Sequence, residues 1–113
     1  MIEKTVLDYL LKNGLRAYME DPPGTPDLPY YIVQKTSGGE SDHLGEAVLA
    51  IQSYGGSLYD AALANEALKA IMPGILAEDS VAGLRLNSDY QYNDYERKRY
   101  RYQAVQNITY YEE

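Results

Sequence analysis

Apolar residues at the start of the chain recur at the spacing of an amphipathic helix. Ile2, Val6 and Leu10 fall on one face, and Gly14 follows as a left-handed cap. The pattern therefore predicts a first helix over Ile2–Lys12. A short strand is expected at residues 15–19.

The middle of the chain changes to a strand pattern. Residues 30–36 are aromatic and β-branched, which favours a strand, and the polar, glycine-containing residues 37–43 predict a hairpin tip. Residues 44–54 are apolar on both faces around positions 47–51. Such a segment belongs in the middle of a covered sheet, so we expect it to have a strand on each side.

A second helix is predicted after Gly55 and Gly56. Ser57 is placed to cap it, with Asp60 three residues later in a capping-box arrangement. Pro73 is expected to end the helix. Its predicted buried stripe consists of Leu58, Ala61, Ala64, Leu68, Ile71 and Met72.

The last third alternates large and polar residues, which is typical of strands with one half-buried face. Two strands are predicted, at residues 81–92 and 98–110, joined around residues 93–95. The order αβββαββ predicts an α+β fold, with an antiparallel sheet of four to five strands and two helices packed on one face. We expect residues 1–113 to form a single domain.

Residues 21–29 hold four of the five prolines, which lack the N–H donor that a ladder needs. We expect this loop and the tip at residues 37–43 to be the most mobile parts of an isolated subunit. The residues expected to form docking loops are Asp21, Pro22, Pro23, Gly24, Gly38, Gly39 and His43.

Composition limits the chemistry that the chain can perform. The net charge of −7 disfavours tight binding to duplex DNA, and the absence of cysteine excludes disulfides and thiolate metal sites. No apolar run approaches the ~20 residues that cross a bilayer, and residues 1–4 do not begin a signal peptide. We expect a protein made in a cytoplasm, with no membrane partner.

No catalytic or cofactor motif is apparent. His43 is the only histidine and has no evident triad partner, and the glycines near it lack the lysine of a phosphate-binding loop. Glu40, Asp42 and Glu46 alternate along a strand end, which is typical of a wet face. The sequence therefore predicts a protein that is not an enzyme, with no catalytic residue, no cofactor and no bound metal.

The chain has thirteen tyrosines but no phenylalanine and no tryptophan. Many of the tyrosines cluster near a basic run at residues 97–101. Three interpretations of the run are open: a solvated strand face, a contact with an acidic neighbouring subunit, or a nucleic-acid contact. Reversing the charge of Arg99 and Arg101 is expected to leave the fold intact. The predicted interface residues are Tyr95, Arg97, Lys98, Arg99, Tyr100 and Arg101.

One stretch and the closing strand pair resemble a known family. The stretch reads LAIQSYGGSLYDAA at residues 49–62, and the strand pair covers residues 84–111. Together with the element order, they resemble the tail terminator, or tail completion, proteins of long-tailed bacteriophages and prophages. The resemblance is one of pattern over nearly the whole chain, and that family has no catalytic motif to carry over.

The resemblance implies a ring, commonly a hexamer, that caps the phage tail tube and joins it to the head connector. The expected partners are other copies of the chain, tail-tube proteins and head-connector proteins, with DNA only as passing cargo. The expected location is the head–tail junction of the virion, after synthesis in the bacterial cytoplasm. A neck connector (stopper or adaptor) of the same junction and a small cytoplasmic enzyme or regulator remain alternatives.

Overall fold

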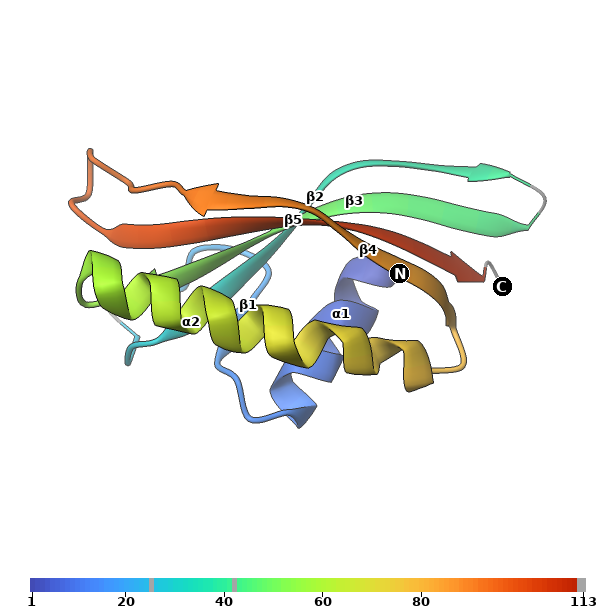
Figure 1. Cartoon of the computed structure of the whole chain (residues 1–113), viewed down its shortest axis with the longest axis horizontal. Coiled ribbons are helices and arrows are strands. Elements are labelled where there is room, and N and C mark those ends of the chain that lie inside the picture. Colours follow the sequence, from blue (N-terminus) through green and yellow to red (C-terminus); the bar gives the residue numbers. More distant parts are fainter. Residues whose placement is uncertain (25, 42, 112–113) are drawn as a thin grey trace.

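A long curved sheet carries both helices on one face, as Figure 1 shows for the computed structural model. The structure describes residues 1–24, 26–41 and 43–111, without the side chains of residues 40 and 41. This arrangement confirms the predicted α+β class and the order αβββαββ. The elements are α1 (Ile2–Lys12), β1 (Ala17–Tyr18), β2 (Tyr30–Ser41), β3 (Leu44–Gly55), α2 (Leu58–Ile71), the 3₁₀ helix η1 (Met72–Ala77), β4 (Val81–Gln91) and β5 (Tyr100–Tyr111).

The strand order in the sheet is β1-β2-β3-β5-β4. β1 runs parallel to β2, and the other three pairings are antiparallel, so the sheet is mixed but mostly antiparallel. β3 lies between β2 and β5, as its apolar sequence predicts. Every residue from Leu49 to Gly55 is buried, because helices cover one face and large side chains of neighbouring strands cover the other.

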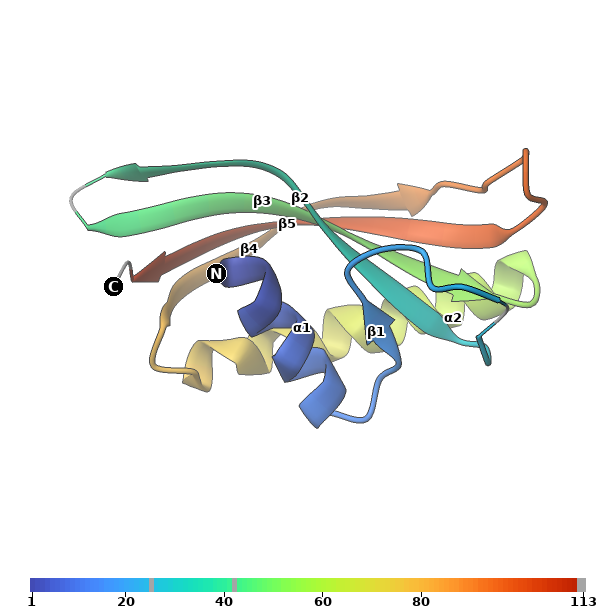
Figure 2. The ribbon, with the colours of Figure 1, turned by 180° about the vertical axis from the view of Figure 1, so that it is seen from behind.

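The main core lies between the sheet and the two helices, which Figures 1 and 2 show from opposite sides. Burying each large aliphatic side chain there contributes about 2 kcal/mol. Alternation along β3 directs Leu49 and Ile51 to this face, while Tyr54 belongs to a smaller cluster on the opposite face. The fully buried members of the main core include Val6, Leu10, Leu49, Ile51, Leu68 and Ile108.

The start of α2 confirms its predicted cap but not its predicted stripe. The Ser57 Oγ accepts a hydrogen bond from the Asp60 backbone N–H at 3.1 Å. Leu58 was expected to be buried and is instead 36% exposed. The helix meets the sheet only from Ala61 onward, where its backbone lies against Gly55, so the first turn projects beyond that contact.

The end of α2 also differs from the prediction. Pro73 does not stop the helical path, because the chain continues from Ile71 into η1. Proline sits at the start of this 3₁₀ segment, where its fixed φ suits the helical path. The segment buries Met72 and Ile75 against the sheet.

The predicted hairpin tip at residues 37–43 is wrong in extent. β2 continues to Ser41 and pairs with the start of β3, after a register shift between Lys35 and Ser37. Gly38 and Gly39, predicted to lie in a docking loop, are therefore ladder residues. A Cβ at Gly38 would lie 2.5 Å from the Cε of Lys35. The glycine therefore leaves space for the Lys35 side chain and does not form a turn.

The other strand boundaries differ by a few residues. β1 covers only Ala17–Tyr18, and β5 starts at Tyr100 rather than at residue 98. Before β5, an isolated bridge joins Asp94 to Arg99 and closes the β4–β5 hairpin. His43 lies in the shortened β2–β3 turn with a φ of 67°, while Asp42 lies outside the described residues.

Gly55 offers a direct test of how closely α2 approaches β3. A Cβ there would lie 2.3 Å from the Ala61 nitrogen, and the backbone cannot turn aside as a flexible side chain could. Gly55→Ala is expected to lower the free energy of unfolding by about 3 kcal/mol in urea titrations, because overpacking forces the helix to shift. Gly39→Ala is the matched control, since a Cβ at Gly39 meets nothing within 4 Å. A loss as small as the control's would contradict the close approach.

Candidate interaction site on the open face of the sheet

The face of the sheet opposite the helices, which we call the open face, carries clusters of tyrosine, arginine and amide side chains. Register places Tyr54 opposite Arg101, Gln52 opposite Gln103, and Val48 opposite Asn107, and all of these residues belong to this open face. Along the strands, the open face divides into a row of tyrosine and arginine, a row of amides, and a trough. Each zone joins side chains from several strands.

The Tyr–Arg row, defined by Tyr18, Tyr30, Tyr54, Arg101, Tyr92 and Tyr90, crosses all five strands. Tyr30 and Tyr54 stack with ring centroids 4.5 Å apart and planes 7° from parallel. The guanidinium of Arg101 lies 5.8 Å from the Tyr54 centroid and 4.5 Å from that of Tyr92. Edge-on contacts of Tyr18 with Tyr30 and of Tyr90 with Tyr92 complete the row. Aromatic and cation–π contacts of this kind each contribute about 1 kcal/mol.

Next to this row, Arg99 joins the proline-rich loop to the β4–β5 hairpin. Its guanidinium donates to Asp21 at 2.8 and 3.0 Å, to Asp94 at 2.9 Å and to the Tyr30 hydroxyl at 3.1 Å. Arg97 adds a second ion pair to Asp21 at 2.6 Å. We call these five residues the Arg99 clamp. It replaces the backbone ladder that the loop, with its prolines, cannot form.

The Arg99 clamp changes the titration of its members. Hydrogen bonds from Arg99 hold the pKa values of Asp21 and Asp94 below their usual range. The same bonds, chiefly the one to Asp21, raise the pKa of Arg99. Burial raises the pKa of Tyr30, although the guanidinium of Arg99 opposes that shift. All three charges are therefore fixed at neutral pH.

These contacts revise the predicted interface. Arg97 and Arg99 find their acidic partners within the chain, and Arg101 donates to the Tyr92 carbonyl at 2.6 Å and to the Tyr54 hydroxyl at 2.9 Å. They argue against the expectation that charge reversal at Arg99 would leave the fold intact. Tyr95 remains 79% exposed, and Lys98 is exposed with no ion pair among the described residues.

The predicted docking loops are likewise divided by the structure. Asp21 is held in the Arg99 clamp, whereas Pro23 and Gly24 are exposed in the loop that follows. Pro22 is half-buried, and His43 is exposed in its turn. The clamp therefore ties down the start of a loop that its prolines alone predict to be mobile, and the mobility of the rest stays a prediction.

A row of amides runs beside the Tyr–Arg row. The Gln52 Nε2 donates to Gln34 at 3.1 Å and to Gln103 at 2.9 Å, and the Gln103 Nε2 donates to the Tyr90 hydroxyl at 2.7 Å. Sequence reasoning missed this row, because cross-strand partners depend on register. The only sign of this row in the sequence was a glutamine in each of three strands, at positions 34, 52 and 103.

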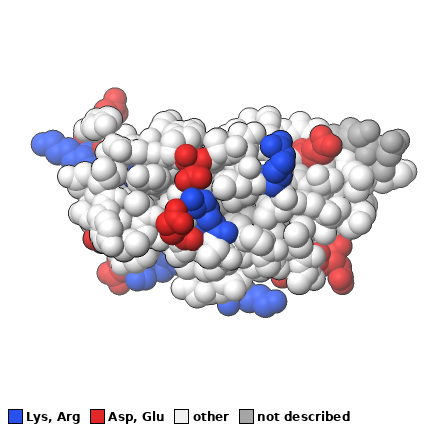
Figure 3. All heavy atoms as spheres, viewed as in Figure 1, with Lys and Arg blue, Asp and Glu red and all other residues white. Residues whose placement is uncertain are grey.

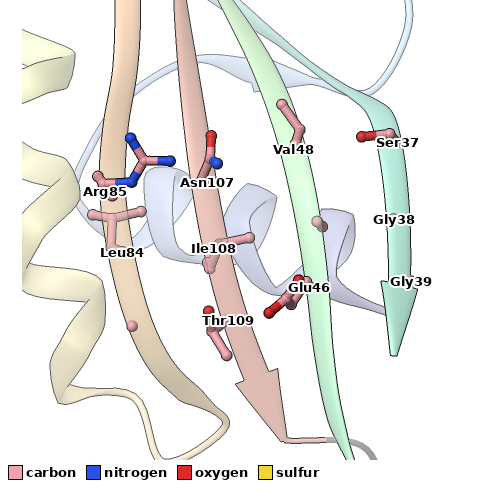
Figure 4. Close-up of a pocket in the computed structure, with 12 residues that line it drawn as sticks. Ser37, Gly38, Gly39, Glu46, Val48, Leu84, Arg85, Asn107, Ile108 and Thr109 are labelled. Carbon is pink, nitrogen blue, oxygen red and sulfur yellow. The ribbon is translucent and has the colours of Figure 1, made fainter. Parts of the chain in front are cut away.

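The third zone is a trough of about 630 Å³ in the half of the sheet far from the β4–β5 hairpin. Figure 4 shows its lining on four strands, with Arg85 on β4, Asn107 on β5 and Glu46 on β3. Both charged side chains are exposed, and neither has an ion pair within the described parts of the chain. The Asn107 Oδ1 is buried without a hydrogen-bond partner there. Glycines line the trough at β2 and β4, so backbone rather than side chain forms much of its rim.

Two kinds of site are absent from the part of the chain that the structure describes. Within residues 1–24, 26–41 and 43–111, no group of three acidic or histidine side chains could hold a metal ion. The described helices include none long and apolar enough to cross a membrane. The Tyr54 ring is not free to stack on bases, because Tyr30 and Arg99 already contact it. No known family model and no curated protein matches the chain.

The Arg99 clamp makes stability depend on pH in a defined direction. Asp21→Asn is expected to lower the free energy of unfolding by about 1 kcal/mol at pH 7, since half-exposed ion pairs are partly screened. The pKa of Asp21 is depressed in the folded state, so its contribution is complete above the ordinary value of about 4 and is lost as pH falls through the folded value.

Urea titrations of wild type and variant from pH 7 to pH 2 measure this difference. It should stay constant down to about pH 5 and shrink below about pH 4. Asp27→Asn is the control, because it removes an exposed carboxylate from the same loop that has no ion pair among the described residues. An equal loss in both variants, or a loss that persists at pH 2, would contradict the clamp.

Proposed function

We propose that the chain is a structural subunit that assembles head to tail into a ring, hexamer-like, which caps a phage tail tube and joins it to the head connector. Its element order is one of the features on which the resemblance to tail terminator proteins rests. In this role the open face and the hairpins supply contacts rather than chemistry.

The observation that carries the proposal is the difference between the two ends of the molecule. The chain is 43 Å long and 25 by 24 Å across. In Figure 1 the β4–β5 hairpin projects at one end, and the β2–β3 hairpin and the end of β5 lie at the other. A closed ring needs two unlike, complementary surfaces on each subunit, whereas a two-fold dimer needs only one.

The charge distribution also suits a conduit for DNA. The net charge of −7 repels phosphate, so a duplex can pass without being held. Much of the basic charge is already neutralised within the fold. Figure 3 shows acidic and basic groups interleaved on the face seen there. Within the fold, Lys69 of α2 lies 2.8 Å from Glu66 and 3.2 Å from Asp89.

The ring is tested by measuring the mass of the purified protein. Light scattering and native mass spectrometry are expected to give a closed oligomer at a whole multiple of 12.7 kDa, growing with concentration and stopping at one size. Negative-stain images should show annular particles. A monomer at every concentration, or a simple dimer, would overturn the proposal.

The conduit is tested with a short DNA duplex. No retardation in a gel is expected at about 0.15 M salt, because a net-negative ring gains no counterion release from phosphate contacts. A control protein of similar size with a basic surface should retard the same duplex. Tight binding by this chain would exclude the passive-conduit role.

A further inference from the structure

We propose that the tip of the β4–β5 hairpin, residues 93–98, seats in the trough of a second copy of this chain. The inference rests on the proposed function and names the contact that would build the ring. It keeps Tyr95 and Lys98 of the interface that the sequence predicts but not its arginines, because these are occupied within their own subunit.

The hairpin tip is built to project a fixed shape. Backbone hydrogen bonds of 2.9 Å join Asp94 and Arg99 in both directions, and the Asp94 carboxylate accepts from the Arg97 N–H at 3.2 Å. Lys98 adopts a φ of 56°, a left-handed conformation that a lysine rarely takes. Strain of this kind persists where the surrounding structure fixes it, and here the Arg99 clamp lies directly behind the tip.

Three side chains of the tip are exposed to solvent. Tyr95 is 79% exposed, which leaves a large apolar ring in water. Glu96 and Lys98 are exposed, and neither forms an ion pair with any described residue. An exposed tyrosine followed by two unpaired opposite charges is a composition that favours a protein contact, because tyrosine is enriched where binding energy is concentrated.

The trough offers the complement of each of these side chains. Glu46 matches Lys98, and Arg85 matches Glu96. The buried Asn107 Oδ1 lacks a donor, and a tyrosine hydroxyl can supply one. Its volume of about 630 Å³ has room for the ring of Tyr95 and its flanking residues. Because the charges on the tip and in the trough are opposite, we infer that the occupant of the trough is the tip of a second copy.

The tip cannot fill the trough of its own subunit. The two lie in opposite halves of a molecule 43 Å long, as Figure 1 shows for the β4–β5 and β2–β3 hairpins. In the proposed ring each subunit offers its tip to one neighbour and its trough to another. Such a contact is heterologous and repeats until the ring closes.

Two charge reversals test the contact. Glu46→Lys damages only the trough, and Lys98→Glu damages only the tip, so each variant alone should need a concentration about tenfold or more higher to assemble. Mixing the two variants in equal amounts brings opposite charges together at both kinds of contact. The mixture should therefore assemble within about threefold of wild type, in alternating order.

The controls use exposed charges outside both surfaces. Asp79→Lys and Lys4→Glu make the same two charge changes and should assemble like wild type. Circular dichroism and thermal unfolding of every variant check that the fold is kept. Tyr95→Ala is expected to weaken assembly about tenfold or more without changing the fold.

The outcomes separate this contact from the ring itself. If wild type assembles and both reversals assemble equally well, the tip-in-trough contact is overturned and the ring stands. If each reversal blocks assembly but the mixture does not recover, the pairing of Lys98 with Glu46 is wrong. A wild type that stays monomeric overturns both proposals.

Discussion

The structure depends on β3 being paired along its whole length on both sides. Residues 44–55 contact β2 on one edge and β5 on the other, so the strand has no edge exposed to solvent. Its side chains have to pack against the helices on one face and against the Tyr–Arg row on the other. Leu49 and Ile51 do the first, and Tyr54 does the second. Each outer strand takes its register from β3, directly or through its neighbour, and the three zones of the open face follow from that register.

Periodicity was enough to predict the α+β class and the order of the elements, although not the parallel pairing of β1 with β2. The helix at Ile2–Lys12, the Ser57 cap and the central strand all follow from local pattern. The failures lie where a tertiary contact overrides a local tendency. Glycines near Lys35 favour a turn, but the ladder to β3 and the space needed by Lys35 keep them in a strand.

The candidate site was harder to predict, since it depends on partners far apart in the chain. The run at residues 97–101 correctly drew attention to the hairpin, but the sequence cannot show that Asp21, 78 positions before Arg99, neutralises it. The amide row and the trough depend on which residues face each other across β2, β3, β5 and β4. The turn around Tyr95 was visible in the sequence, and the structure leaves the Tyr95 side chain 79% exposed.

Because of the Tyr–Arg row, we expect the two halves of the sheet to differ in bending stiffness. At the hairpin end, side chains brace all five strands across the face that lacks helices, so curvature there is fixed by stacked rings and a guanidinium. At the trough end, Gly38, Gly39 and Gly83 add no side-chain brace. That end is held by the ladder and by the helices beneath it. In the proposed contact between two copies, the hairpin end would therefore be the stiffer partner, and the entropy lost on binding would fall mainly on the trough end.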